Sequence, residues 1–174
     1  MKRRHTKAEA LALINKLRAA IPDIALRTTL LVGYPGETEE DFMELMEFVK
    51  TTKFDRLGVF AYSEEEGTPA ASFPDMVDEN IREHRKDILE EQQDTRVEEL
   101  YSAMIDSETE VVVEGYDKYL AEGGLYFGRS AMFAPEIDGM IYFSAPKERG
   151  LKIGDFVNIR IFDVLENNLI GEVI

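Results

Sequence analysis

The sequence predicts an α+β fold of two units: part of a β/α barrel over residues 1–106, then a small five-stranded antiparallel β-barrel over residues 107–174. Three observations support this prediction. Residues 24–62 read as strand, helix and strand, which normally gives two parallel strands with a right-handed crossover. Residues 78–106 are charged with an intermittent apolar stripe, which indicates one long helix or two. After Ser107, short β-rich runs alternate with glycines, as in small barrels.

The chain opens with a predicted helix and a predicted strand. Residues 7–20 favour a helix because Thr6 and Glu9 fit a capping box and apolar residues recur on one face. Pro22 disfavours its continuation. The segment Ile24–Val32 predicts a strand that is buried on both faces, because its apolar residues hardly alternate with polar ones.

A second helix and a second strand follow. Thr38 with Asp41 predicts another capping box, and the helix that it opens has apolar residues at i, i+3, i+4 and i+7. These residues are Phe42, Leu45, Met46 and Val49. The second strand is expected over Leu57–Tyr62. Residues 63–74 are expected to form a loop that precedes the long charged segment.

The first unit is predicted to be incomplete. Two parallel strands cannot close a sheet or cover their own edges. Either the helices pack unusually, or residues 1–106 are the trailing part of a larger repeating β/α domain, similar to a TIM barrel; we favour the second. Such a truncated unit should expose an apolar strand edge or sheet face, through which the chain could self-associate.

The second unit is predicted from five β-rich runs. These runs are Glu110–Glu114, Tyr119–Phe127, Met140–Phe143, Phe156–Val164 and Leu169–Ile174. From Ser107 to the end there are twelve acidic and six basic residues, a net charge of −6. A small barrel that binds RNA usually carries a basic face, so this composition disfavours binding through phosphate contacts.

Composition narrows the functional classes further. A net charge of −15 repels nucleic-acid phosphate and suits a basic protein partner, although acidity can also serve solubility alone. The chain has no cysteine, which excludes disulfides, thiolate nucleophiles and iron–sulfur ligation by its own residues. His5 and His84 are far apart in sequence, so no metal site is expected. No apolar run is long enough for a membrane helix or a signal peptide, and we expect a cytoplasmic location.

Two places follow predicted strands and are candidate binding sites. The turn Gly33–Thr38 could hold a phosphate, carboxylate or ribose at a helix N-terminus; from composition alone, a plain β–α connection is favoured. Phe60 and Tyr62 end the second strand, where aromatic side chains can wall a ligand, although both also suit an ordinary core. Nothing in the spacing of the carboxylates singles out a catalytic acid–base pair.

Several motifs, in order along the chain, resemble the radical S-adenosylmethionine methylthiotransferases. They are Val32–Thr38 (Val-Gly-Tyr-Pro-Gly-Glu-Thr), Glu40–Phe42, Tyr62–Ala70 and the segment Asp78–Arg96. Residues 107–174 resemble the TRAM domain, an OB-like barrel, that follows the catalytic domain in this family. The resemblance spans essentially the whole chain.

Within this family, Gly128–Ser130 and Ala134–Gly139 are similar to the branch that modifies a ribosomal protein. That resemblance implies transfer of a methylthio group to an aspartate of small-subunit ribosomal protein number twelve, a basic substrate. The alternatives are a fragment of the branch that modifies tRNA, and a stand-alone module that binds protein or RNA.

The resemblance also implies cofactors and site residues. Complete members of the family use S-adenosylmethionine and two 4Fe-4S clusters held by two sets of three cysteines. Because this chain has no cysteine, we expect it to lack catalytic and metal-binding residues, to bind no cofactor and to be inactive alone. Gly33, Phe60 and Tyr62 would shape the S-adenosylmethionine pocket, with Thr28 and Thr29 as weaker candidates. In the TRAM-like unit, Glu136 and Asp138 are the candidates for docking the substrate.

Overall fold

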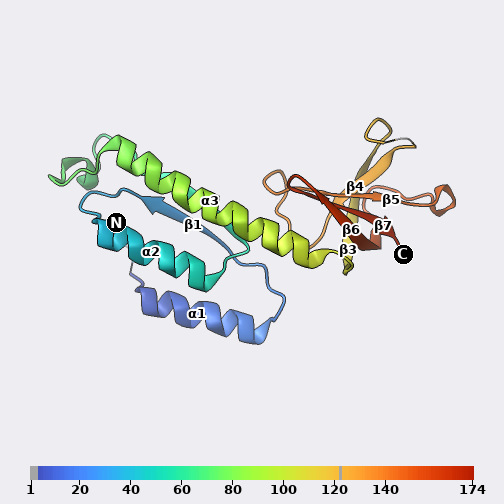
Figure 1. Ribbon diagram of the computed structural model, residues 1–174, viewed down its shortest axis with the longest axis horizontal. Coiled ribbons are helices and arrows are strands. Elements are labelled where there is room, and N and C mark those ends of the chain that lie inside the picture. The colour runs from blue at the N-terminus through green and yellow to red at the C-terminus, as the bar shows by residue number, and fades with distance from the viewer. Residues whose placement is uncertain (1–3, 122) are drawn as a thin grey trace. The chain divides into compact units, whose positions relative to one another are not determined.

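The computed structural model describes residues 4–121 and 123–174 (Figure 1). The predicted strand Tyr119–Phe127 includes position 122, which lies outside the described residues. The chain divides into two compact units, one that ends at Val97 and one over Glu98–Ile174. The predicted division before Ser107 stays a prediction, and each unit is considered by itself below. No helix among the described residues has the length and apolarity needed to cross a membrane.

The first unit contains two parallel strands with helices packed against them. Its elements are α1 (Lys7–Ala20), β1 (Arg27–Val32), α2 (Glu39–Thr52), β2 (Arg56–Ala61), the short turn η1 (Pro69–Ser72) and the first part of α3 (Glu79–Met104). The strands β1 and β2 run in parallel, and α2 connects them. The strand–helix–strand unit is therefore as predicted, and the long charged segment forms a single helix.

Both predicted capping boxes are present. At α1, the Thr6 hydroxyl accepts from the backbone N–H of Glu9, and the Glu9 carboxylate accepts from the Thr6 N–H at 2.7 Å. At α2, Thr38 and Asp41 exchange the same pair of hydrogen bonds. Each box satisfies N–H groups that the first turn of a helix leaves without partners, which is why each helix starts where it does. The helix α2 ends at Lys53, which has a left-handed backbone with φ of 53°.

The hydrophobic core of the first unit lies on one face of the two-stranded sheet. Val32 and Val59 on this face form a core with side chains of α2 and α3. These partners are Phe42, Val49 and Leu89, which are 0–5% exposed. The predicted burial of the first strand on both faces is wrong, because Arg27 and Thr29 are exposed. The strand also begins at Arg27, three residues later than predicted.

The other face of the sheet carries side chains that alternate with the packed ones. The pairings Thr29–Gly58 and Leu31–Phe60 place these four residues together, because side chains two apart on a strand point to the same side. Phe60 is 62% exposed. We call these four residues the open sheet face.

The second unit is a closed five-stranded barrel. Its strands are β3 (Glu108–Asp117), β4 (Leu125–Arg129), β5 (Ile141–Ser144), β6 (Phe156–Leu165) and β7 (Asn168–Val173), in the order β3-β4-β5-β7-β6. Four of the pairs are antiparallel, but β5 and β7 are parallel, so the barrel is mixed rather than wholly antiparallel as predicted. The reason is topological: β6 turns tightly into β7, and this hairpin brings β7 alongside β5 in the same direction.

The barrel interior is filled by β-branched and other apolar side chains at alternate strand positions. Those with at most 1% exposure are Val111, Val113, Ile141, Phe143, Ile159, Ile161 and Leu169. The predicted strand from Tyr119 starts only at Leu125, because Gly123 and Gly124 have φ of 97° and 76° and belong to the preceding turn. This interior gives the second unit its own hydrophobic core.

Candidate functional site

The candidate site of the first unit lies where β1 and β2 end. Here the turn 33–38, the loop that follows β2 and the first turns of α3 come together. The N–H of Tyr62 donates to the carbonyl of Val32 at 2.8 Å, so the two strand ends stay joined past the sheet. The carboxyl ends of parallel strands are the usual place for binding sites in α/β proteins.

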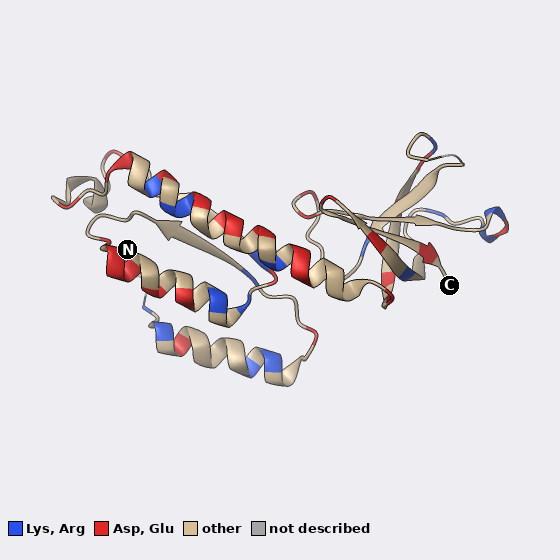
Figure 2. Ribbon diagram, in the orientation of Figure 1, with Lys and Arg blue, Asp and Glu red and all other residues tan. Residues whose placement is uncertain are grey.

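The backbone donors of the turn 33–38 are occupied by groups of the protein itself. The Gly33 N–H donates to the Glu37 carboxylate at 2.9 Å, and the Gly36 N–H donates to the carbonyl of Asp75 at 2.7 Å. Asp41 accepts from the N–H of Thr38, and Figure 2 shows acidic residues in red at the start of α2. This arrangement disfavours a phosphate here, because the helix N-terminus already carries negative charge. The turn serves as a β–α connection in the described structure.

A buried arginine neutralises this acidic turn. Arg85 of α3 is 5% exposed and bonds to Glu37 at 2.7 Å and to Glu39 at 3.0 Å. Its guanidinium also lies 5.2 Å from the centre of the Phe42 ring. Burial acts to lower the pKa of Arg85, but the hydrogen bonds to Glu39 and Glu37 outweigh it, so the pKa is raised. Arg85 is therefore a permanent cation that fixes the turn to α3.

A second arginine of α3 ties the two strand ends together. Arg82 donates to the carbonyl of Tyr62 at 2.6 Å, and its guanidinium lies 5.9 Å from the Tyr62 ring. The aliphatic stem of Arg82 crosses directly over Gly33: a Cβ at Gly33 would stand 2.1 Å from the Arg82 Cγ. Gly33 has φ of 70°, so both its backbone and this close approach require glycine.

Aromatic side chains surround Tyr62. The Tyr34 ring stands edge-on to the Tyr62 ring at 5.4 Å and to the Phe73 ring at 6.3 Å between centres. Tyr62 is 9% exposed, and its buried hydroxyl has no hydrogen-bond partner among the described residues. A buried hydroxyl without a partner costs about 1–3 kcal/mol, so this group favours any ligand that can bond to it.

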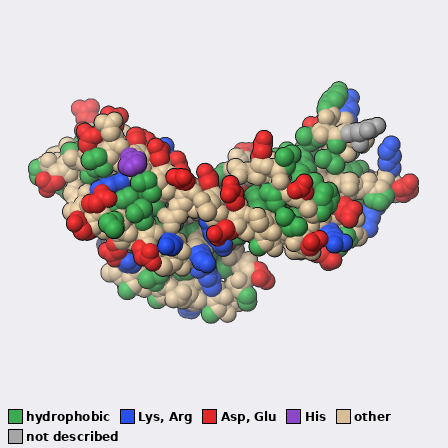
Figure 3. Space-filling model, viewed as in Figure 1, with side chains coloured by type: hydrophobic (Ala, Val, Ile, Leu, Met, Phe, Trp, Pro, Cys, Tyr) green, Lys and Arg blue, Asp and Glu red, His purple; other side chains and the backbone are tan. Residues whose placement is uncertain are grey.

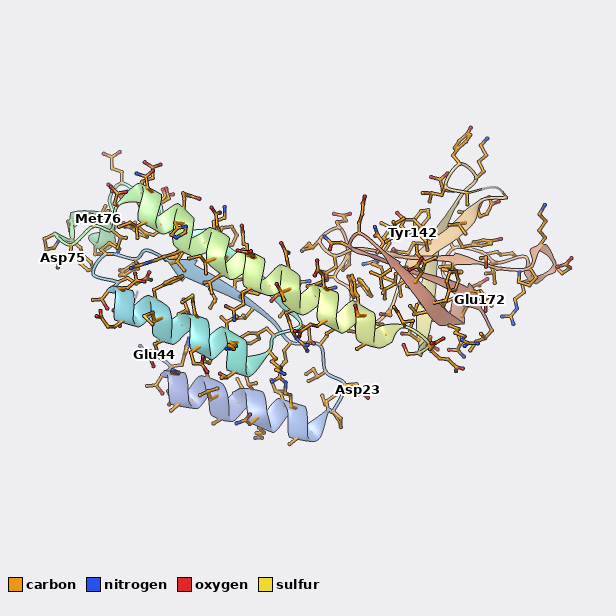
Figure 4. All side chains as sticks on the ribbon, in the orientation of Figure 1. Asp23, Glu44, Asp75, Met76, Tyr142 and Glu172 are labelled. Atoms are coloured by element: carbon orange, nitrogen blue, oxygen red, sulfur yellow. The ribbon has the colours of Figure 1, made fainter. Side chains whose placement is uncertain are left out.

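Two clefts open beside these residues. The first, of about 290 Å³, is lined by the end of β2 and the start of α3, including Tyr62, Ser63 and Arg82. The second, of about 490 Å³, is lined by residues 36–38, residues 75–78, Ile81 and Arg85. Figure 4 labels Asp75 and Met76, which lie in the loop before α3. Among residues 4–121 and 123–174, no group of three or more His, Asp or Glu is arranged to hold a metal ion.

The structure brings together only part of the predicted site. Gly33 and Tyr62 meet at the strand ends, through Arg82. Thr29 and Phe60 lie on the open sheet face, whereas Thr28 belongs to the packed side of β1. The sequence analysis did not identify Arg82 and Arg85, because a helix rich in charged residues is usually a solvated surface. The available signal was their spacing of three residues, which places both on one side of the helix.

The candidate docking residues of the second unit differ from each other in role. The Asp138 carboxylate accepts from the Ala134 N–H at 2.7 Å and closes the turn between them. Glu136 is exposed and has φ of 61°. Nearby, Arg129 is paired with Glu114, and this hydrogen-bonded pair raises the Arg129 pKa. Of the two predicted residues, Glu136 is the accessible one and Asp138 shapes the loop.

The fold and site together define a class of protein: an α/β part with two parallel strands, followed by a small β-barrel that matches the TRAM domain over residues 105–174. Over its whole length, the chain matches the carboxyl-terminal part of the RimO-type radical S-adenosylmethionine methylthiotransferases. It is 48% identical over 176 residues to the ribosomal protein uS12 methylthiotransferase RimO of Citrifermentans bemidjiense. It is 47% identical over 174 residues to the protein of the same name from Geobacter sulfurreducens, and 43% identical to that from Clostridioides difficile.

These alignments take in all of the chain and 38% of each of these three relatives. The chain thus spans well under half the length of the curated relatives that it matches.

Proposed function

We propose that this chain is the carboxyl-terminal part of an enzyme that adds a methylthio group to an aspartate of the small-subunit ribosomal protein uS12. The observation that carries this proposal is the identity of 43–48%, across the entire chain, to three proteins named for that activity. The acidity of the barrel unit supports a basic protein substrate over tRNA, whose phosphates it would repel.

In this proposal the first unit supplies part of the S-adenosylmethionine pocket. The cofactor is a sulfonium cation and carries no phosphate, which agrees with a turn whose N–H donors already bond to carboxylates and a carbonyl of the protein itself. The cleft lined by Tyr62, Ser63 and Arg82 adds polar side chains, which suit the polar groups of the nucleoside and the amino acid. The residues present therefore fit this cofactor. S-adenosylmethionine, when bound to a reduced cluster, supplies the radical chemistry.

The roles of this chain's own residues follow from the contacts. Arg82 holds the Tyr62 carbonyl and covers Gly33, so it fixes the rim of the pocket. Arg85 keeps the turn 33–38 attached to α3. Thr29 and Phe60 would face the interior of the complete barrel from the open sheet face. Without a cysteine, the chain cannot ligate an iron–sulfur cluster by thiolates, so both clusters belong to another part of the longer protein.

The proposal is tested with a longer protein that joins this segment to the cluster-binding portion found in relatives. After reconstitution with iron and sulfide, it is incubated with S-adenosylmethionine, a reductant and either uS12 or tRNA. We expect mass spectrometry to find a methylthio group on an aspartate of uS12 and none on tRNA. The reverse result would assign the chain to the tRNA-modifying alternative. No modification of either, with intact clusters, would favour a binding module.

A further inference from the structure

A stripe of apolar side chains crosses the outside of the barrel. Tyr142 of β5 points outward, because its neighbours Ile141 and Phe143 are fully buried. It pairs with Phe127 of β4 on one side and with Ile170 of β7 on the other. Phe162, at the bulge of β6 beside Ile170, is 50% exposed. We call Phe127, Tyr142, Ile170 and Phe162 the barrel stripe.

The barrel stripe is fixed in place by the strands beneath it. The Phe127 ring lies over Gly115 of β3, where a Cβ would stand 2.3 Å from the ring. The rings of Phe127 and Tyr142 have centres 6.3 Å apart and are tilted by 59°. Rigid, partly exposed aromatic groups of this kind are the usual anchors of protein interfaces, because little side-chain entropy is lost on binding.

Carboxylates border the barrel stripe. Asp163 is exposed and pairs with Ile170 across β6 and β7. Glu172 is exposed two residues beyond Ile170, on the same side of β7; Arg160 lies opposite it on β6 and forms an ion pair with Asp106. Figure 3 shows hydrophobic side chains together on the visible face of the barrel unit, with acidic ones around them, and Figure 4 labels Tyr142 and Glu172.

We propose that the barrel stripe, with Asp163 and Glu172, is a docking surface for an arginine- and lysine-rich segment of a protein partner. Aromatic faces attract guanidinium and ammonium groups, and the neighbouring carboxylates pair with the same cations. The net charge of −6 on residues 107–174 steers such a segment toward this unit. RNA also stacks on aromatic groups, but its phosphates would meet Asp163 and Glu172. The inference rests on the proposed function, in which the partner is the basic protein uS12.

The test measures binding of purified uS12 to the 174-residue chain by biolayer interferometry at several salt concentrations. Tyr142→Ala should weaken binding by about tenfold or more, as expected for an aromatic anchor. Glu172→Gln should weaken it by about threefold, mainly through slower association at low salt. The matched control Glu110→Gln removes the same charge from an exposed position of β3, opposite Asn158 and off the barrel stripe, and should change binding by less than twofold.

Thermal melts followed by circular dichroism should show that each variant is folded. Glu172→Lys, a further surface variant, should lose more affinity for uS12 than Glu172→Gln. Equal losses of affinity for Glu110→Gln and Glu172→Gln would overturn the inference, because they would show that only the net charge of the chain matters for binding. Tighter binding of tRNA than of uS12 would overturn it in favour of RNA. If the chain does not bind uS12 but the longer protein still modifies it, the proposed docking surface is wrong while the proposed function stands. If the longer protein does not modify uS12, the proposed function itself is wrong.

Discussion

The ring of Tyr101, near the end of α3, lies 5.9 Å from the ring of Phe133 in the β4–β5 loop, with the two planes tilted by 31°. Both side chains are buried, at 1% and 6% exposure. The last turns of α3 therefore contribute to the core of the second unit, which spans Glu98–Ile174. Asp106, just before β3, adds an ion pair with Arg160 of β6 at 3.1 Å.

Tyr101→Ala should destabilise the second unit. Truncating a fully buried aromatic residue removes its transfer free energy and leaves a cavity, a loss of about 3–5 kcal/mol in comparable cores. We expect a lower denaturation midpoint for the barrel transition in urea, followed by circular dichroism. A shortened chain of residues 107–174 should be less stable than one of residues 98–174 for the same reason.

Tyr119→Ala is the matched control, since this tyrosine is 83% exposed on the hairpin between β3 and β4. Its loss should change the free energy of unfolding by no more than about 0.5 kcal/mol. Similar midpoints for the Tyr101 and Tyr119 variants would contradict the assignment of α3 to the barrel core.

Gly33→Ala should disturb the strand ends through Arg82. The left-handed backbone alone costs about 1–2 kcal/mol for a residue with a Cβ, and here the Cβ would also displace the Arg82 stem. Gly36→Ala, with φ of 86° and no atom within 4 Å of the Cβ position, should show only the backbone cost. Differential scanning calorimetry should therefore give a larger loss at Gly33 than at Gly36.

A double-mutant cycle separates the two contributions at Gly33. In an Arg82→Ala background the added methyl group meets only the Cβ of residue 82, at 2.9 Å, so the further loss from Gly33→Ala should shrink but stay above that of Gly36→Ala. Strict additivity would show that Arg82 and Gly33 are not coupled.

In the proposed enzyme, Arg82→Lys should retain more affinity for S-adenosylmethionine than Arg82→Ala at equal stability, since the stem and one donor remain.

The capping box of α2 should make this unit sensitive to acid. Hydrogen bonds from the backbone and hydroxyl of Thr38 lower the pKa of Asp41, and Arg85 lowers it further. A carboxyl whose pKa is lower in the folded state stabilises the fold above its ordinary pKa of about 4 and loses this effect as the pH falls through the lowered value. An NMR titration should place the Asp41 pKa below the ordinary value, with Thr38→Ala raising it and Thr38→Ser preserving it.

The parts of the fold that were predicted correctly depend on local patterns. Thr38 and Asp41 are three residues apart, and the side chains from Phe42 to Val49 share a helix face whatever lies beyond. The parallel pairing of β5 and β7 joins segments far apart in sequence, and no local signal distinguishes it from an antiparallel one. The open side of β1 could not be read from the sequence either, because an apolar run looks the same whether or not a layer covers it.

The strand end at Gly33 was predicted from turn chemistry, whereas its contacts with α3 were missed because they depend on packing. Gly33 follows a strand and precedes a capped helix, which marks a strand end directly. Arg82 and Arg85 belong to α3, whose many charges predict a solvated helix. Only the packing of α3 against the turn shows that one of these arginines is buried and that the other covers a glycine.

The open sheet face should cause self-association through Phe60. This side chain is 62% exposed beside Leu31 on a sheet of two strands, and exposed apolar faces and unpaired edges favour contact with a second copy. Light scattering should show a mass that rises with concentration, and Phe60→Ser should reduce it. Met43→Ser is the control, because Met43 is 58% exposed on α2 and lies off this face. A constant monomer mass over a wide concentration range, with little binding of an apolar dye, would show that the open sheet face does not self-associate.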